Sequence, residues 1–278
     1  PTYNGYSHWA KREVIVPPSP LLAYPSVMGH RGAAALAPEN TLAGLDAAAR
    51  AGCTWVEVDV MLSHDGVPVL HHDYLLRRTA GLRRRVESLT AAELTELDVG
   101  ANFDPAFTGA KIPTLADALA AMQNRGLTPN IEIKPAPKRE IETADAVIAT
   151  LESEWLPAGP PPLLSSFIGA SLCRVRDRAP HIPRALLTIR PPRKWRAALD
   201  NLETDILHVS RKHVTAKRVE TIIDSGIRLG IYTVNEPAEA RTFRAWGAHC
   251  IITDTPDRVA PWAEAPLAPL DPPKAAAE

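Results

Sequence analysis

The sequence predicts an α/β fold, a parallel (β/α)8 barrel formed by a single domain. Short apolar segments flanked by Gly or Pro recur along the chain, and several are rich in Val and Ile, as expected for buried strands. Amphipathic stretches with helical periodicity fill the intervals between them. The length of 278 residues suits such a barrel, which takes about 250 residues. An open doubly wound sheet is the alternative.

The predicted elements follow one another in a strand–helix order. A helix is expected over Thr41–Ala51 and ends at Gly52, and either Asn40 or Thr41 can cap it. Another helix begins after Thr114, where Asp117 gives a pattern similar to a capping box. The eight predicted strands are Ser26–His30, Thr54–Met61, Pro129–Lys134, Pro162–Ser166, Pro183–Thr188, Ile206–Val209, Arg228–Val234 and Ala248–Thr253.

The predicted organisation is one barrel domain over residues 26–260. An irregular segment, 1–25, precedes it, and a flexible tail rich in Pro and Ala, 261–278, follows it. The interval 74–111 is too long for a loop between a strand and a helix, and it contains a helix-like stretch at Thr90–Leu97. We therefore expect a small insertion there, after the second strand.

Composition excludes several classes of protein. A hydrophobic fraction of 45% is too high for a disordered chain, and no uninterrupted apolar run is long enough to span a membrane. The net charge of −1 argues against a nucleic-acid-binding protein. The cysteines are far apart and form no C-x-x-C pair, which argues against disulfides and a zinc ribbon, and two of them, Cys53 and Cys250, are expected in the core. No signal-peptide pattern opens the sequence, so the expected location is the cytoplasm.

Carboxylates at the ends of two predicted strands indicate a metal site. Glu57 and Asp59 are two residues apart on one strand, so their side chains point to the same face. They would repel each other unless a cation lay between them, and oxygen ligands suit Mg²⁺, Ca²⁺ or Mn²⁺ better than zinc. Glu132, on the next strand, is a candidate third ligand. A solvated face, or an ion pair with Lys134, is the alternative interpretation.

Two histidines lie at the same predicted rim. His30 and His72 are candidates for general acid and general base, because imidazole titrates near neutral pH. A single histidine at a strand end is more often structural, but two beside carboxylates favour catalysis. Arg31 and Lys134 add positive charge suited to a phosphate ester. The remaining histidines are expected to be structural or at the surface: His8, His64, His71, His181, His208, His213 and His249.

A series of short motifs resembles the glycerophosphodiester phosphodiesterase family, in the family's order and from Val27 to about Val259. The similarity is greatest to the compact bacterial cytoplasmic enzymes. Together the motifs are specific, although each is short. They are His30-Arg31-Gly32, Pro38-Glu39-Asn40-Thr41, Glu57-x-Asp59, His72-Asp73, Glu132-Ile133-Lys134, Ser165-Ser166-Phe167, Tyr232-Thr233-Val234-Asn235 and Ile252-Thr253-Asp254.

The resemblance implies a TIM barrel with a small insertion after the second strand. It implies metal-dependent hydrolysis of glycerophosphodiesters, such as glycerophosphocholine or glycerophosphoethanolamine, to sn-glycerol 3-phosphate and an alcohol. It also assigns His30 and His72 as the acid/base pair, and His72 is chosen over His71 because it directly precedes the aspartate of the motif.

The resemblance also assigns binding roles. Glu57, Asp59 and Glu132 would hold one divalent cation, Mg²⁺ or Ca²⁺, with Mn²⁺ as an alternative. Arg31 and Lys134 would contact the phosphate.

Other positions near these motifs have two interpretations each. Tyr232 stands where the family often has tryptophan, and it retains an aromatic surface for the substrate. Phe167 and Trp246 could cover the glycerol or the head group, although Trp246 also has the spacing of a core residue. Glu39 could line the site or bond the surrounding loop, and the second interpretation is favoured.

Two rival functions are ranked lower. A phosphodiesterase acting on phosphoinositides or lysophospholipids would need an apolar or membrane-facing rim, which no amphipathic anchor here supplies. A non-catalytic barrel that only binds a phosphorylated ligand would be expected to lack a histidine or a carboxylate of the motifs, and all are present. The expected partner is a small-molecule glycerophosphodiester, and no sequence pattern singles out an oligomer interface.

Overall fold

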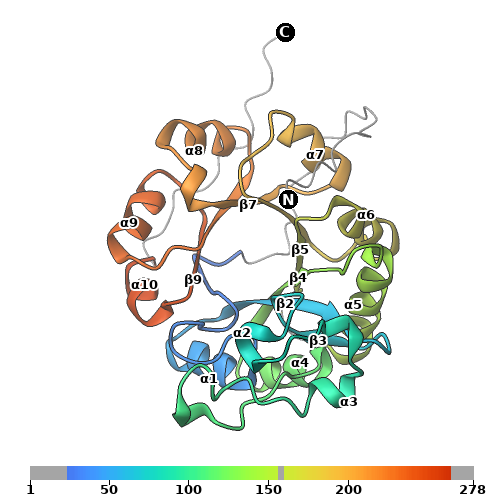
Figure 1. Ribbon diagram of the computed structural model, residues 1–278. Helices are drawn as coiled ribbons and strands as arrows, with labels where there is room; N and C mark the ends of the chain where they lie inside the picture. The colour runs from blue at the N-terminus through green and yellow to red at the C-terminus, as the bar shows by residue number, and fades with distance from the viewer. Residues whose placement is uncertain (1–23, 156–159, 264–278) are drawn as a thin grey trace.

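The computed structural model describes residues 24–155 and 160–263, and these form a closed parallel β-barrel inside a ring of helices (Figure 1). The barrel is closed because β1 pairs with both β2 and β9. The predicted (β/α)8 barrel is confirmed, and the alternative prediction of an open doubly wound sheet is wrong. The eight barrel strands are β1 (Val27–Gly29), β2 (Trp55–Leu62), β4 (Thr128–Ile133), β5 (Leu163–Ser166), β6 (Arg184–Thr188), β7 (Ile206–Ser210), β8 (Arg228–Tyr232) and β9 (Cys250–Thr253).

The helices outside the barrel alternate with its strands. They are α1 (Leu42–Arg50), α4 (Leu115–Asn124), α5 (Glu140–Glu154), α6 (Gly169–Arg178), α7 (Trp195–Leu202), α8 (Ala216–Ile223), α9 (Pro237–Ala245) and α10 (Pro256–Ala263). A short 3₁₀ helix, Arg211–His213, follows β7.

Polar residues start the helices at the positions that the sequence indicates. Thr41, and not Asn40, caps α1, because its hydroxyl accepts a hydrogen bond from the backbone N–H of Gly44 at 3.1 Å. The hydroxyl of Thr114 caps α4 in the same way, but the Asp117 carboxylate accepts from that hydroxyl rather than from the backbone. The expected box there is therefore only half formed.

Apolar side chains fill two regions on either side of the barrel wall. Val56, Val58 and Val60 alternate along β2 with the carboxylates and point outward against the helices. Inside the barrel, residues such as Met28 and Trp55 close the end opposite the strands' carboxyl termini. Cys250 belongs to this inner cluster and Cys53 to the outer one, so the prediction that both are core thiols is confirmed.

Polar groups seal the bottom of the barrel. Arg228 forms two hydrogen bonds to the buried Asp205, at 2.6 and 2.9 Å, and lies 5.7 Å from the ring of Tyr24. The Tyr24 hydroxyl is 2.8 Å from Nε2 of His208. Burial lowers the pKa of His208 to about 3, so this histidine is neutral and structural, as expected.

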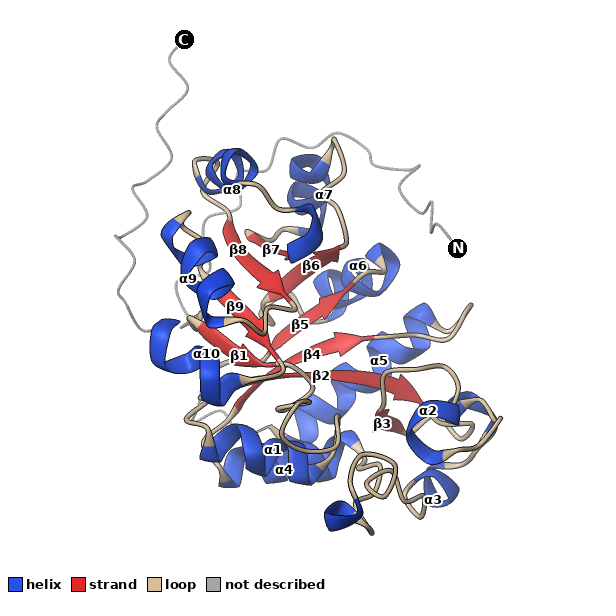
Figure 2. Cartoon of the chain, turned by 60° about the vertical axis from the view of Figure 1, so that its left-hand side comes forward, coloured by secondary structure: helices blue, strands red, loops and turns tan. Residues whose placement is uncertain are grey.

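The segment between β2 and α4, residues 63–114, is an excursion from the barrel. It lies beside the carboxyl end of β2 (Figure 2). It begins with β3 (Pro68–Leu70), which pairs antiparallel with β2, ahead of the predicted insertion 74–111. Its remaining elements are short: α2 (Arg77–Ala80), α3 (Ala91–Leu94) and the 3₁₀ helices Val86–Ser88 and Pro105–Phe107.

The excursion has its own small core. Buried Leu76, Val86 and Leu94 pack with Met61 of β2 and Val69 of β3, so the core anchors the excursion to the barrel. A capping box starts α3, since Thr90 and Glu93 bond each other's backbone N–H groups. The predicted domain limits at residues 25 and 261 stay predictions, and most of 1–25 and 261–278 lies outside the described residues.

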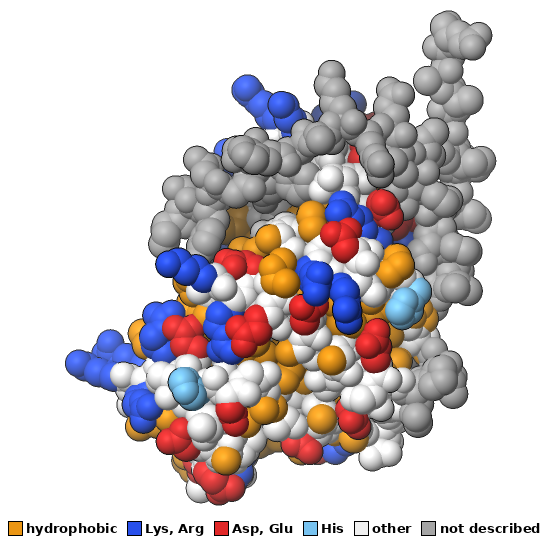
Figure 3. Space-filling model, turned by 90° about the vertical axis from the view of Figure 1, so that its right-hand side faces the viewer, with side chains coloured by type: hydrophobic (Ala, Val, Ile, Leu, Met, Phe, Trp, Pro, Cys, Tyr) orange, Lys and Arg blue, Asp and Glu red, His pale blue; other side chains and the backbone are white. Residues whose placement is uncertain are grey.

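Basic and acidic side chains are intermingled over the face that carries α5 and α6 (Figure 3). This agrees with the nearly balanced charge of the chain. Within the described ranges, no helix has both the length and the apolar character needed to cross a bilayer.

The core of the excursion should be needed for stability. Leu94 is fully buried, so Leu94→Ala is expected to lower the free energy of unfolding by about 2–5 kcal/mol. Leu82→Ala, at a position 39% exposed in the same excursion, should cost about 0.5 kcal/mol or less. Chemical denaturation measures both, and equal costs would contradict an anchoring core.

Candidate active site

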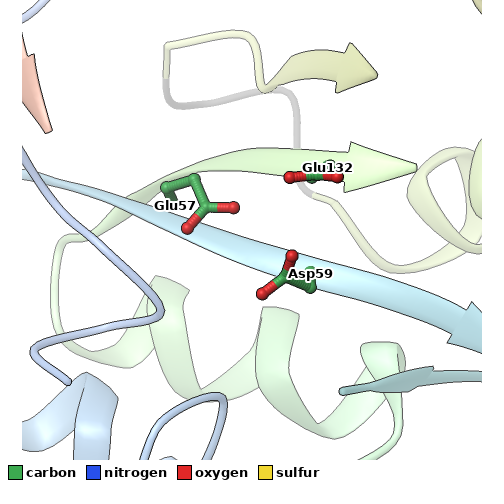
Figure 4. A group of neighbouring side chains, drawn as sticks. All are labelled: Glu57, Asp59 and Glu132. Carbon is green, nitrogen blue, oxygen red and sulfur yellow. The ribbon is translucent and has the colours of Figure 1, made fainter. Parts of the chain in front are cut away.

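Three carboxylates meet inside the mouth of the barrel (Figure 4). Glu57 and Asp59 share the inner face of β2, and the register places Glu132 of β4 beside Asp59. All three side chains are buried, and one oxygen from each lies within 4.8 Å of the others. This separation suits a shared hard cation, because Ca²⁺ and Mg²⁺ hold carboxylate oxygens at about 2.0–2.6 Å.

The electrostatics of this cluster also suit a cation. Burial and the negative charges of Asp59 and Glu132 raise the pKa of Glu57 well above its ordinary value. Burial and Asp59 likewise raise the pKa of Glu132 to about 8. The three carboxylates repel one another, and burial strengthens that repulsion. A divalent ion would relieve it, so the donor set fits such an ion.

Polar atoms next to the carboxylates have no hydrogen-bond partner within the described part of the chain. Among them are the side-chain amide of Asn130, which is level with Glu57, and the hydroxyl of Ser165, which is level with Glu132. Both side chains are fully buried. Since buried polar groups almost always have partners, the inner faces of β4 and β5 are suited to a hydrated ion.

Lys134 and Arg31 flank the cluster. Nζ of Lys134 is 3.3 Å from Asp59 and 3.9 Å from Glu132, and Nε of Arg31 is 3.4 Å from Asp59. Burial alone would raise the pKa of Asp59, but these two cations and the Asn40 amide outweigh it and hold that pKa below its ordinary range. The ion pair between Lys134 and the carboxylates therefore forms as part of the cluster.

A tight turn after β1 positions Arg31. Its backbone N–H donates to Glu57 at 3.0 Å, and Gly32 follows at φ +85°. A Cβ at Gly32 would lie 2.7 Å from the backbone of Gly44, so only glycine lets α1 approach this turn.

His30 is held by a carboxylate from the last barrel strand. Its Nδ1 lies 2.5 Å from Asp254, and Asn235 donates to the other oxygen of Asp254 at 2.8 Å. Its Nε2 is left beside the cluster, 3.8 Å from Glu57. A carboxylate at Nδ1 fixes the orientation of the ring and leaves Nε2 free to face the cluster.

His72 has the same kind of support on the other side of the cluster. Its Nδ1 is 2.6 Å from the Asp73 carboxylate. Burial lowers the pKa of His72, and the attraction of Asp59 offsets part of that effect. The ring of the neighbouring His71 points elsewhere, between the Asp73 carbonyl and Thr79, so it has a structural place, as predicted.

A chain of alternating charges joins Asp73, the partner of His72, to Arg31 on the other side of the cluster. Arg78 donates to both oxygens of Glu39, at 2.6 and 2.7 Å, and to Asp73 at 2.8 Å. Glu39 also accepts from Arg31 at 3.0 Å, and burial of its carboxylate is outweighed by the two arginines, which lower its pKa. Glu39 thus binds the arginines around the site.

Three residues of the site had no role in the sequence-based prediction. Arg78 stands among other arginines, and no local pattern marks it. Asp254 was quoted only as part of a motif. Asn40 was considered only as a cap, whereas it pairs with Asp59 through both its amide and its carbonyl, at 2.9 and 3.0 Å. Its φ of +54° is the one local signal, and it is visible only in the structure.

The aromatic residues separate into two groups. Phe167 and Tyr232 follow β5 and end β8, and their rings meet edge to face with centroids 6.1 Å apart. The Tyr232 hydroxyl donates to the Thr188 carbonyl at 3.0 Å. Trp246 instead packs against Phe243 in the outer core after α9, far from the mouth, in line with the core interpretation.

Groups with these charges can hold a phosphate ester while protons move on either side of it. The fold and the site therefore define a class, the phosphoric ester hydrolases built on a (β/α)8 barrel.

Comparison with known proteins identifies the family within this class. The family model described as the glycerophosphoryl diester phosphodiesterase family matches residues 30–258. The chain belongs to this family, and it is an enzyme, a glycerophosphodiester phosphodiesterase.

Relatives of known sequence and structure agree. A glycerophosphodiester phosphodiesterase of Caldanaerobacter subterraneus subsp. tengcongensis is 31% identical over 83% of this chain and 94% of its own length. A phosphodiesterase of Oleispira antarctica, solved with the product sn-glycerol-3-phosphate, is 32% identical with a TM-score of 0.84 and covers 87% of this chain and 98% of its own. The glycerophosphodiester phosphodiesterase of Thermotoga maritima is 27% identical, covers 84% and 96%, and has a TM-score of 0.64.

Adding Mg²⁺ or Ca²⁺ should stabilise the fold. At about 100 times its Kd the ion should contribute about 2.7 kcal/mol. The shift in Tm should grow from pH 6 to pH 8, because the ion must displace protons from Glu132, with its pKa of about 8, and from Glu57. Calorimetry of Glu132→Gln should show most of the shift lost, and the exposed control Glu96→Gln should keep it. Equal shifts in the two variants would contradict this metal site.

Loss of Arg78 should impair catalysis more than stability. Arg78→Gln is expected to lower kcat about tenfold to a hundredfold, because both Asp73 and Glu39 lose their shared donor. KM should change little, and the free energy of unfolding should fall by about 1 kcal/mol or less, since the side chain is half exposed. Arg78→Lys should restore little, because an ammonium cannot bridge both carboxylates. Steady-state kinetics, with Arg83→Gln as control, test this, and an unchanged kcat would refute it.

Proposed function

We propose that the enzyme hydrolyses glycerophosphodiesters, such as glycerophosphocholine and glycerophosphoethanolamine, to sn-glycerol 3-phosphate and an alcohol. The observation that carries the proposal is the placement of His30 and His72, each held by its own carboxylate, around one cluster of three buried carboxylates. The sn-glycerol-3-phosphate bound to the Oleispira antarctica relative supports the product.

Glu57, Asp59 and Glu132 would hold a divalent cation, Mg²⁺ or Ca²⁺, with Mn²⁺ as an alternative. When bound, such an ion polarises the phosphate and offsets its negative charge. Buried oxygen donors alone make up the cluster, which favours these hard cations.

The residues around the cluster would bind the substrate and transfer the protons. Arg31 and Lys134 neutralise the phosphate as charge grows in the transition state. One imidazole takes the proton of the nucleophile, which is water or the glycerol 2-hydroxyl, and the other gives a proton to the leaving oxygen. Both can act through Nε2, since Nδ1 of each faces a carboxylate. Phe167 and Tyr232 offer their rings to the apolar side of the substrate.

A cytoplasmic location is part of the proposal. Cys53, Cys173 and Cys250 are all free thiols, as is usual in a reducing compartment.

The decisive assay is release of glycerol 3-phosphate from glycerophosphocholine with Mg²⁺ or Ca²⁺, and then with EDTA. We expect release that depends on the metal. His30→Ala and His72→Ala should each reduce turnover by about two or more orders of magnitude. His64→Ala, at an exposed histidine, should leave it unchanged.

Other outcomes would overturn parts of the proposal. Near-normal turnover by both histidine variants would remove them from the mechanism. No release from several glycerophosphodiesters with any divalent ion would reject the substrate class. Assays with lysophospholipids and binding of phosphorylated ligands would then come first.

A further inference from the structure

A pocket of about 550 Å³ opens beside the catalytic rim, between the barrel mouth and α2. His72 and Lys134 form its inner wall and are shared with the carboxylate cluster. The excursion supplies the remaining wall, including Tyr74, Leu75 and Arg77. The pocket is thus continuous with the catalytic centre on the His72 side.

Most of the cations that line the pocket are already neutralised. Arg78 is bound to Glu39 and Asp73, and Lys134 is paired with Asp59. The side chain of Arg77 is exposed, and within residues 24–155 and 160–263 no acidic group forms an ion pair with it. Arg77 therefore gives the pocket a positive charge that the protein does not balance.

The rest of the outer wall is apolar and fixed. The Tyr74 hydroxyl donates to the Pro135 carbonyl at 3.1 Å, and the guanidinium of Arg85 lies 5.8 Å from the Tyr74 ring. Leu75 is 47% exposed and faces the same space. A carbon skeleton can pack against this wall, while a negative group or hydroxyls reach Arg77.

We propose that this pocket holds the head group of the leaving alcohol, and that Arg77 makes the enzyme prefer anionic head groups over neutral polyols, and neutral polyols over cationic choline. The proposal rests on the proposed function. The carboxylate cluster lies on the inner faces of β2 and β4 and, in the proposed function, takes the phosphate and glycerol. The pocket beyond His72 is then left for the other ester substituent.

This placement also assigns the two proton transfers. The bond from phosphorus to the head-group oxygen breaks, and that oxygen takes its proton from His72. The oxygen of the attacking hydroxyl bonds to phosphorus, and its proton passes to His30. His72 thus acts as the general acid because it borders the pocket.

Kinetics on three matched substrates test the specificity. They are glycerophosphoinositol 4-phosphate, glycerophosphoinositol and glycerophosphocholine, with anionic, neutral and cationic head groups. We expect kcat/KM to fall in that order. Arg77→Gln should reduce the anionic-to-cationic ratio about fivefold, and Arg77→Glu about tenfold or more. The preference should weaken as salt rises from 0.05 M to 0.5 M.

Arg83→Glu is the matched control. It makes the same charge change on an exposed arginine of the same excursion that does not line the pocket, so the ratio should stay as in the wild type. A ratio that Arg77→Glu leaves unchanged, or an equal change of kcat/KM for all three substrates, would overturn the proposal. Hydrolysis of none of the three would instead reject the proposed function.

A leaving group that needs no proton tests the position of the head group. With sn-glycerol 3-(p-nitrophenyl phosphate), His72→Ala should recover at least tenfold of its loss, and His30→Ala should recover little. Recovery by His30→Ala alone would place the leaving group on the opposite side and contradict the proposal.

Discussion

The repulsion among three buried carboxylates is the constraint on which the rest of the structure depends. Glu57, Asp59 and Glu132 are adjacent because parallel strands in register bring their inner faces together. The charge there must be offset, and the barrel provides Lys134, Arg31 and the Asn40 amide for that purpose. The same excess of negative charge that costs stability without an ion is what makes the mouth suited to one.

Around the three carboxylates, further pairs of oppositely charged side chains balance the charge of the site. Each histidine is oriented by an aspartate, and on one side Arg78 joins that aspartate to Glu39 and so to Arg31. The positions of His72 and Arg31 are therefore not independent. A shift of α2 would disturb both, which explains why a short helix of an excursion needs a buried core and a capped neighbour.

Sequence periodicity predicted the parts of this structure that depend on local order. The eight strands, the Thr41 and Thr114 caps and the turn at Gly52 all follow from patterns of a few residues. The carboxylates were found because alternation along a strand fixes their common face. Arg78 was missed because its partner Glu39 is 39 residues away, and nothing in the local sequence indicates that contact. The second function of Asn40 was hidden for the same reason, since it pairs with Asp59 on another element.

The separate core of the excursion has a consequence for how such an enzyme can diversify. The barrel strands fix the three carboxylates, while the excursion, with its own small core, borders the space beside them. Exposed Arg77 can be exchanged without repacking the barrel, whereas exchange of its neighbour Arg78 removes the donor that Asp73 and Glu39 share. One turn of helix thus places a residue without an ion pair among the described residues beside one that is bound to two carboxylates, so single substitutions can change the wall of the pocket and leave the carboxylate cluster as it is.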